Sequence, residues 1–163
     1  MANPDGPNGF RAVETDSGQM AVRRYPVAAS QTIAKGDAVF LSSGLVTIAV
    51  ATTPQLLGIA ASAVTTTASP VRATDTVMVY VATPGQIFEG QCSGSSTAAL
   101  LGTSCDIEGT TGIMEINENA TTEDVIHIVG WKSDEDPKLA LGANDIGRFI
   151  IIRSQYCPML AAK

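Results

Sequence analysis

The chain has 163 residues, of which 45% are hydrophobic, 16% are charged and 5% are aromatic. This composition excludes wholesale disorder, and the length suits one domain. No apolar run approaches the ~18–20 residues that a membrane-spanning helix needs, so we expect no membrane partner. Residues 1–6 show neither the basic start nor the apolar segment of a secretory signal, which predicts a product of the cytosol.

The net charge of −6 is unevenly distributed. Residues 1–85 balance to zero, residues 86–145 carry eleven acids against two bases, and residues 146–163 carry three bases and no acid. An acidic middle repels phosphate backbones, so we expect no nucleic-acid partner. Three cysteines, Cys92, Cys105 and Cys157, fit no metal or redox spacing, and we expect free thiols. The alternative is a Cys92–Cys105 bridge across a turn.

The first nineteen residues are unlike the rest. They are rich in Gly, Pro and Asn, and they show neither helical nor alternating hydrophobic periodicity. We therefore predict an extended N-terminal arm over residues 1–19 and a single β domain over residues 20–163. Because the arm has no periodic apolar face, we expect its removal to leave the hydrophobic core and the melting temperature almost unchanged.

From Met20 onward the chain resembles a series of short β-strands. Residues 38–41 and 45–51 flank Ser42-Ser43-Gly44, which predicts a hairpin with a three-residue loop. The small apolar side chains of residues 57–64 suit a strand crowded on both sides. Residues 77–82 alternate, and the Pro and Gly of residues 83–86 then suit a type II turn.

The second half of the domain continues this pattern. We expect one helical turn within residues 96–101, and a polar loop over residues 133–147 whose acidic tip is solvated. The remaining strands are predicted at residues 113–116, 125–131 and 148–152, and the continuous apolar run of the last suggests burial on both faces. About nine short strands without βαβ alternation predict an all-β fold, either a small barrel or a sandwich.

The sequence offers little catalytic chemistry. His127, the single histidine, lies among strand residues and has no partner at metal-ligand spacing, so we interpret it as a core or interface residue. No nucleophile elbow, P-loop or dinucleotide fingerprint occurs. Asp134, Glu135 and Asp136 with Asp145 fit no EF-hand pattern, and Asp106 with Glu108 lacks a neighbour that would raise either pKa. We predict no catalytic, cofactor or metal site, no small-molecule substrate, and a protein that is not an enzyme.

Three stretches together resemble the capsid decoration, or cement, proteins of tailed bacteriophages. The first runs from residue 33 to 39, continues with Gly44 and ends at residues 56–61, in the order "K-G-D-x-V … G … L-G-[VI]-A". The second covers residues 77–81 and 85–88. The third is the closing strand, residues 147–155. The resemblance spans about residues 20–157, and the order and spacing of the motifs carry it, since each motif alone is common turn or strand chemistry.

This resemblance implies a structural virion protein with no catalytic site. Members of the family are small β-rich domains that bind the outside of an expanded icosahedral shell, usually as trimers, and bridge neighbouring capsid subunits. The implied partner is the major capsid protein, the implied state is a homotrimer, and the implied location is the capsid surface. The apolar runs at residues 57–64 and 149–152 are further grounds for expecting a trimer.

The arm and its junction with the domain supply the candidate shell contacts, because an extended segment binds by adding a strand to its partner. These candidates are Phe10, Arg11, Val13, Arg23 and Arg24. Arg24 has an alternative role, as a charge that protects a strand edge from unwanted pairing.

Two other function classes remain open. The first is a sugar-binding or host-adhesion β domain on a virion or cell surface, which would need exposed aromatic rings. The second is a trimeric β-barrel nucleotide hydrolase, which shares the "K-G-D-x-V" style of strand but needs a phosphate cradle and an ordered acid for a metal-bound water.

Overall fold

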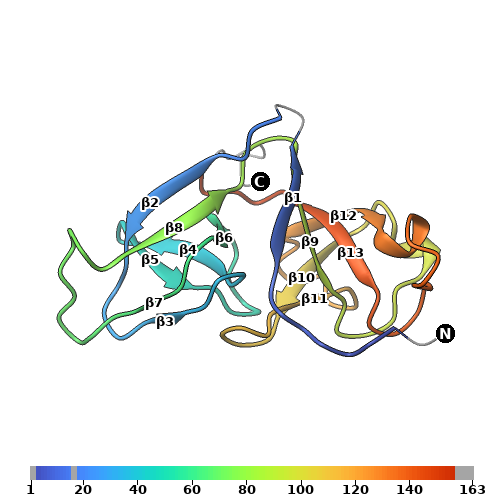
Figure 1. Ribbon diagram of the computed structural model, residues 1–163, viewed down its shortest axis with the longest axis horizontal. Coiled ribbons are helices and arrows are strands. Elements are labelled where there is room, and N and C mark those ends of the chain that lie inside the picture. Colours follow the sequence, from blue (N-terminus) through green and yellow to red (C-terminus); the bar gives the residue numbers. More distant parts are fainter. Residues whose placement is uncertain (1–2, 16–17, 157–163) are drawn as a thin grey trace.

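The computed structural model describes residues 3–15 and 18–156. Thirteen strands and two 3-10 turns lie in these ranges, so the fold is all-β as predicted, with more strands than the nine expected. The strands form two lobes that lie side by side (Figure 1). Lobe A holds β2 to β8 within residues 22–81, and lobe B holds β1 with β9 to β13, from residues 3–15 and 86–151.

Lobe A is built on a five-stranded antiparallel sheet in the order β2-β8-β6-β4-β5, beside the short pair β3-β7. Its strands are β2 (Val22–Pro26), β3 (Thr32–Ile33), β4 (Ala38–Ser42), β5 (Leu45–Ile48), β6 (Gly58–Ala60), β7 (Val64–Thr65) and β8 (Thr76–Val81).

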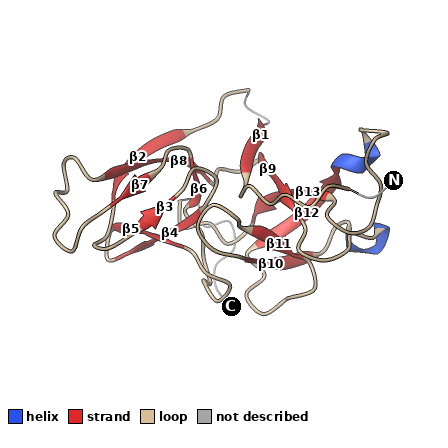
Figure 2. Cartoon of the chain, turned by 60° about the horizontal axis from the view of Figure 1, so that its bottom comes forward, coloured by secondary structure: helices blue, strands red, loops and turns tan. Residues whose placement is uncertain are grey.

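Lobe B is built on a six-stranded antiparallel sheet in the order β1-β9-β13-β12-β10-β11. Its strands are β1 (Arg11–Thr15), β9 (Gln86–Gln91), β10 (Ser104–Glu108), β11 (Glu115–Asn117), β12 (Ile126–Trp131) and β13 (Ile146–Ile151). The 3-10 turns η1 (Ala98–Leu100) and η2 (Lys132–Asp134) lie at the end of lobe B that is remote from lobe A (Figure 2). The architecture is sandwich-like, and neither sheet of the described strands closes into a barrel.

Two turns show how local sequence sets the strand pairing. The predicted β4–β5 hairpin is present, but Ser42 pairs with Leu45, so the loop has two residues rather than three. Ser43 and Gly44 both have positive φ, as a type I′ turn requires. Gly85 also has positive φ and follows Pro84, with the Gln86 N–H donating to the Thr83 carbonyl, which matches the predicted type II turn.

Strand β6 is crowded, as its small side chains predicted. Gly58 has a φ of +157°, and a Cβ there would collide with the backbone of Tyr80 on the neighbouring strand β8. Glycine therefore permits the close approach of the two strands.

Two apolar runs behave differently from expectation. Strand β13 alternates between buried and half-buried residues rather than being buried on both faces, because one face of this sheet packs into the core and Arg148 lies on the other. Strand β12 carries a bulge between Ile128 and Gly130, which leaves Val129 exposed and returns Trp131 to the core.

The core is continuous across the two lobes. One buried cluster contains Ala38 and Ile59 from lobe A together with Phe88, Ile128 and Phe149 from lobe B. A second, smaller cluster lies within lobe A. Because the larger cluster contains residues of both lobes, burial of its apolar surface holds the lobes together.

Both ends of the described chain cross between the lobes. Residues 3–15 precede lobe A in sequence but pack on lobe B, where β1 pairs with β9 (Figure 1). After β13 the chain returns to lobe A, where Ser154 forms a parallel bridge with Leu56. The Gln155 side chain then pairs with the N–H and the carbonyl of Leu41. Each end thus ties one lobe to the other.

Candidate functional site

The N-terminal segment, residues 3–15, is docked along lobe B, and we call it the strap. At its start, the Asn3 side chain makes three hydrogen bonds, two to the carbonyls of Ala140 and Ala143 and one from the Ala140 N–H. Further along, Gln91 of β9 accepts from the Gly6 N–H and donates to the Asp5 carboxylate. The expectation of an arm that takes no part in the core is therefore wrong for these residues.

Phe10 is the apolar anchor of the strap and is only 3% exposed. Its ring meets the Phe149 ring edge-on with centroids 5.2 Å apart, and its N–H donates to the Gly36 carbonyl of lobe A over 2.8 Å. Gly90 makes the slot for the ring, because a Cβ at Gly90 would collide with it. The sequence did not predict this burial, because Phe10 is a single large apolar residue in a segment without hydrophobic periodicity.

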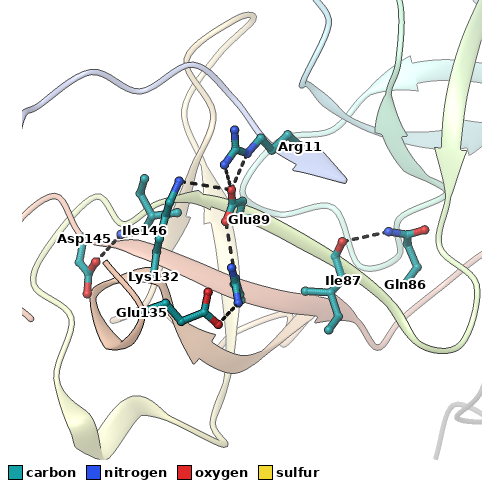
Figure 3. Close-up of polar contacts among 9 residues, drawn as sticks. Arg11, Gln86, Ile87, Glu89, Lys132, Glu135, Asp145 and Ile146 are labelled. Atoms are coloured by element: carbon teal, nitrogen blue, oxygen red, sulfur yellow. Dashed lines mark hydrogen bonds and ion pairs between the residues drawn. The ribbon is translucent and has the colours of Figure 1, made fainter. Parts of the chain in front are cut away.

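Arg11, the next strap residue, joins a group of charges around Glu89 of β9, which we call the Glu89 cluster (Figure 3). The Glu89 carboxylate is buried and pairs with Arg11, with Lys132 Nζ at 3.7 Å and with Arg148 Nε at 3.6 Å. Arg148 also pairs with the exposed Glu135. A buried carboxylate among three cations is costly to unpair, so the cluster fixes β1, β9 and β13 in register.

A cavity of about 220 Å³ lies beside the Glu89 cluster. Strap and β9 residues both line it, so it lies along their boundary. Its lining consists of strap residues 6 and 8–11, β9 residues 89–91, Lys132 and Ile146.

The structure separates the five residues predicted to form a shell-contacting arm. Phe10 and Arg11 face lobe B, and Val13 lies at an irregularity in the β1–β9 pairing. Arg23 and Arg24 are exposed on β2 of lobe A. The prediction placed them along the arm and at its junction with the domain, and in the structure they are divided between the two lobes.

The β2 strand lies at the edge of the lobe A sheet and pairs only with β8 in that sheet. The Arg23 guanidinium donates to the Val22 carbonyl over 3.2 Å. Pro26, at the end of the strand, has no N–H to offer a further strand. A charged side chain over a carbonyl and a proline at the end of the strand both discourage edge-to-edge pairing. The edge-protecting role of Arg24 stays a prediction, because the carbonyl contact is made by its neighbour Arg23.

The Lys35-Gly36-Asp37 turn lies at the junction of the lobes. Asp37 is fully buried, and its carboxylate accepts from the Ala34 N–H within the turn and from the Gly112 N–H of lobe B, each over 2.7 Å. Burial raises the pKa of Asp37, and these two hydrogen bonds oppose that rise. The same turn supplies the Gly36 carbonyl that holds Phe10.

Several acids of the acidic middle are buried, which the charge pattern did not indicate. Asp106 accepts from the N–H groups of residues 122, 123 and 124, so it closes the loop before β12. Asp145 accepts from the hydroxyls of Ser96 and Ser133, so it is not part of a solvated tip. Within residues 3–15 and 18–156, no group of three or more His, Cys, Asp or Glu side chains is placed to hold a metal ion.

The structure also places the histidine, two of the three cysteines and the exposed tyrosine. His127 is half-buried, and its Nδ1 lies 3.2 Å from the Ser104 hydroxyl. Cys92 and Cys105 are buried free thiols, as predicted, and burial raises the pKa of Cys105 to about 12. Cys157 lies outside the described residues. Tyr156 is the exposed aromatic residue of the described chain, at 39%.

No helix among the described residues is long and apolar enough to cross a membrane. No model of a known protein family matches the chain, and a search of curated proteins found no match.

Proposed function

We propose that this chain is a capsid decoration protein that binds the outside of an icosahedral shell and bridges major capsid subunits. The supporting observation is that the three stretches carrying the resemblance meet at one place, the junction of the lobes. Gly36 and Asp37 exchange backbone hydrogen bonds with Ala60. Leu56 exchanges them with residues 153 and 155 of the third stretch, and Gly58 pairs with Val81 of the second stretch.

This junction gives the motifs a mechanical role. The turn at residues 35–37 holds the strap and the β10–β11 loop, while the closing segment, residues 153–155, bonds to Leu56 just before β6 and to Leu41 of β4. A protein that bridges subunits transmits load from one contact to another, so its own parts must stay fixed. Crossovers at both ends of the described chain and a shared core provide that rigidity here.

Arg23 and Arg24 carry the proposed shell contact. Both are exposed on lobe A, whereas Phe10 is buried against lobe B and Arg11, although exposed, is paired with Glu89 of lobe B. We therefore place the contact at the β2 edge of lobe A rather than on a free arm. Two cations there suit an acidic patch on the capsid subunit, and rim charges of this kind set the association rate and its salt dependence.

The homotrimer is part of the same proposal, but the apolar runs at residues 57–64 and 149–152 no longer support it. Leu57 and Ile59 are buried in the core of the single chain, and so are Phe149 and Ile151, so these strands are not left over for an interface. What supports a trimer is avidity: several weak contacts on neighbouring subunits together give high occupancy.

The test uses expanded shells assembled from the major capsid protein that the proposal requires as partner. Purified protein is mixed with expanded shells, and bound protein is measured by sedimentation. The wild-type chain should decorate the shells, and the Arg23→Glu/Arg24→Glu variant should bind at least about tenfold more weakly, a change of ~1.4 kcal/mol. Arg72→Glu, an exposed lobe A residue remote from β2 in sequence, is the control and should bind as the wild type does. Failure of the wild type to sediment with the shells would overturn the proposal.

Two further measurements address the other function classes. A glycan array reports sugar binding, and a thermal-shift screen with nucleotides reports a phosphate site. Saturable binding in either assay, combined with no decoration of shells, would replace the proposed function with the corresponding class.

A further inference from the structure

The strap is bound to lobe B as a separate peptide would be. Its covalent continuation leads into lobe A, because only six residues, 16–21, separate the end of β1 from the start of β2. Nothing but noncovalent contacts links residues 3–15 to the part of lobe B that they cover. The main contacts are the β1–β9 pairing, the Phe10 slot, the Arg11–Glu89 pair and the hydrogen bonds of Asn3.

The groove under the strap is built for this segment. Gly90 leaves the space that the Phe10 ring fills, and Glu89 presents a buried carboxylate to Arg11. The Gln91 side chain accepts a hydrogen bond from the Gly6 N–H, and the carbonyls of residues 140 and 143 accept from the Asn3 side chain. These features recognise an apolar ring, a guanidinium and an amide at fixed positions along an extended peptide.

We propose that this groove also accepts the strap of a second copy of the chain, so that copies become joined by exchanged straps. Every contact of the strap with the groove is the same whether the strap comes from its own chain or from another. The choice between the two therefore depends on the connector and on protein concentration. Because the contact energy is the same for a strap bound to its own lobe B and for one bound to another copy's lobe B, it does not decide between them. A high local concentration of copies favours exchange.

The strap can leave its groove without disturbing the rest of the sheet. A pocket of about 220 Å³ lies between strap residues 6 and 8–11 and β9, so the strap is not packed against lobe B along its whole length. The open outer edge of β1, which ends the sheet, allows the strand to leave without breaking any other strand pair. This inference rests on the strap contacts alone and stands whether or not the chain binds a shell.

The test traps the exchanged strap with a disulfide. Glu14 of β1 lies opposite Ile87 of β9. One copy carries Glu14→Cys and another carries Ile87→Cys, both with Cys157→Ser. The two are mixed, unfolded under reducing conditions, refolded together at about 1 mM, which matches the effective concentration of a short tether, and then oxidised. A covalent heterodimer on a nonreducing gel is the expected result.

Matched controls make the result decisive. The double variant Glu14→Cys/Ile87→Cys in one chain reports docking of a chain's own strap. Replacing Ile87→Cys by Thr47→Cys, a half-buried position on β5 of lobe A, should abolish the heterodimer, as should Gly90→Ala on the Ile87→Cys copy. A heterodimer absent from the mixture while the double variant closes within its own chain would overturn exchange. Equal cross-linking with Thr47→Cys would also overturn it, because random collision would then explain the product.

Discussion

The two lobes use the same kind of strands but assemble them differently. Lobe A is a continuous stretch of chain, and its buried polar residues are few: Asp37, Thr53 and Thr66. Lobe B combines the strap with residues 86–151. It buries a larger set of polar side chains, which comprises Asn3, Gln86, Glu89, Gln91, Ser96, Asp106, Glu118 and Asp145.

The two lobes therefore differ in the interactions that hold their strands and loops in place. In lobe A, the β4–β5 hairpin and the small side chains of β6 bring neighbouring strands together. In lobe B, long connections replace tight turns, and buried carboxylates hold them by accepting backbone and hydroxyl hydrogen bonds. Such groups are costly when left unpaired, so lobe B should be the more sensitive to polar substitution.

Removing the strap should have the largest effect. A chain that starts at Met20 loses β1, the Asn3 hydrogen bonds and Phe10, and a buried phenylalanine alone is worth about 3–5 kcal/mol. Since a domain's total stability is about 5–15 kcal/mol, lobe B should unfold at or near room temperature. Thermal denaturation followed by circular dichroism measures this. A truncated chain that melts within a few degrees of the full chain would contradict the docked strap.

Neutralising Glu89 should be the next most damaging change. Glu89→Gln keeps the volume but removes the carboxylate that Arg11, Lys132 and Arg148 share, and a hydrogen bond to a charged group is worth about 1.5–3 kcal/mol. The matched control is Glu135→Gln, which removes the exposed partner of Arg148 and should cost less than about 1 kcal/mol. Urea unfolding of both variants compares them, and similar losses would show that burial of Glu89 does not matter.

Two glycines on neighbouring parts of lobe B give a sharper comparison. Gly90→Ala puts a methyl group into the Phe10 ring and should cost about 1–3 kcal/mol through overpacking. Gly130→Ala places its methyl group 3.8 Å from the Arg148 side chain, an ordinary contact, and should be neutral or stabilise by up to about 1 kcal/mol. Chemical denaturation of the pair checks the sign. A Gly90→Ala variant as stable as Gly130→Ala would mean that the slot is not tightly filled.

The smallest predicted effect is a pH dependence on β11. Burial raises the pKa of Glu115, and so do Asp5 and Glu108. Because the folded-state pKa is above the unfolded value, the folded protein binds the proton more tightly, and stability falls as pH rises from about 4.5 through the folded pKa. Glu115→Gln should therefore be more stable than the wild type at pH 7, by less than about 1 kcal/mol, and equal to it at pH 3. Denaturant unfolding at both pH values tests this, and an advantage that persists at pH 3 would rule out titration as its cause.

The sequence by itself determined the features that depend on neighbouring residues. The all-β class, the β4–β5 hairpin, the type II turn at residues 83–86, the 3-10 turn at residues 98–100 and the crowding of β6 were all predictable. Each follows from strand periodicity, from turn residues that tolerate positive φ, or from side-chain size, and these act over a few residues.

Tertiary structure alone decided the rest. Phe10 has no periodic partners in sequence, and its burial depends on Gly90 and Phe149, which lie 80 and more residues away along the chain. Asp106 and Asp145 resemble solvated charges until the loops that donate to them are in place. Whether an isolated apolar side chain or carboxylate is buried depends on surfaces and donors supplied by distant segments, and one segment's own pattern carries no record of them.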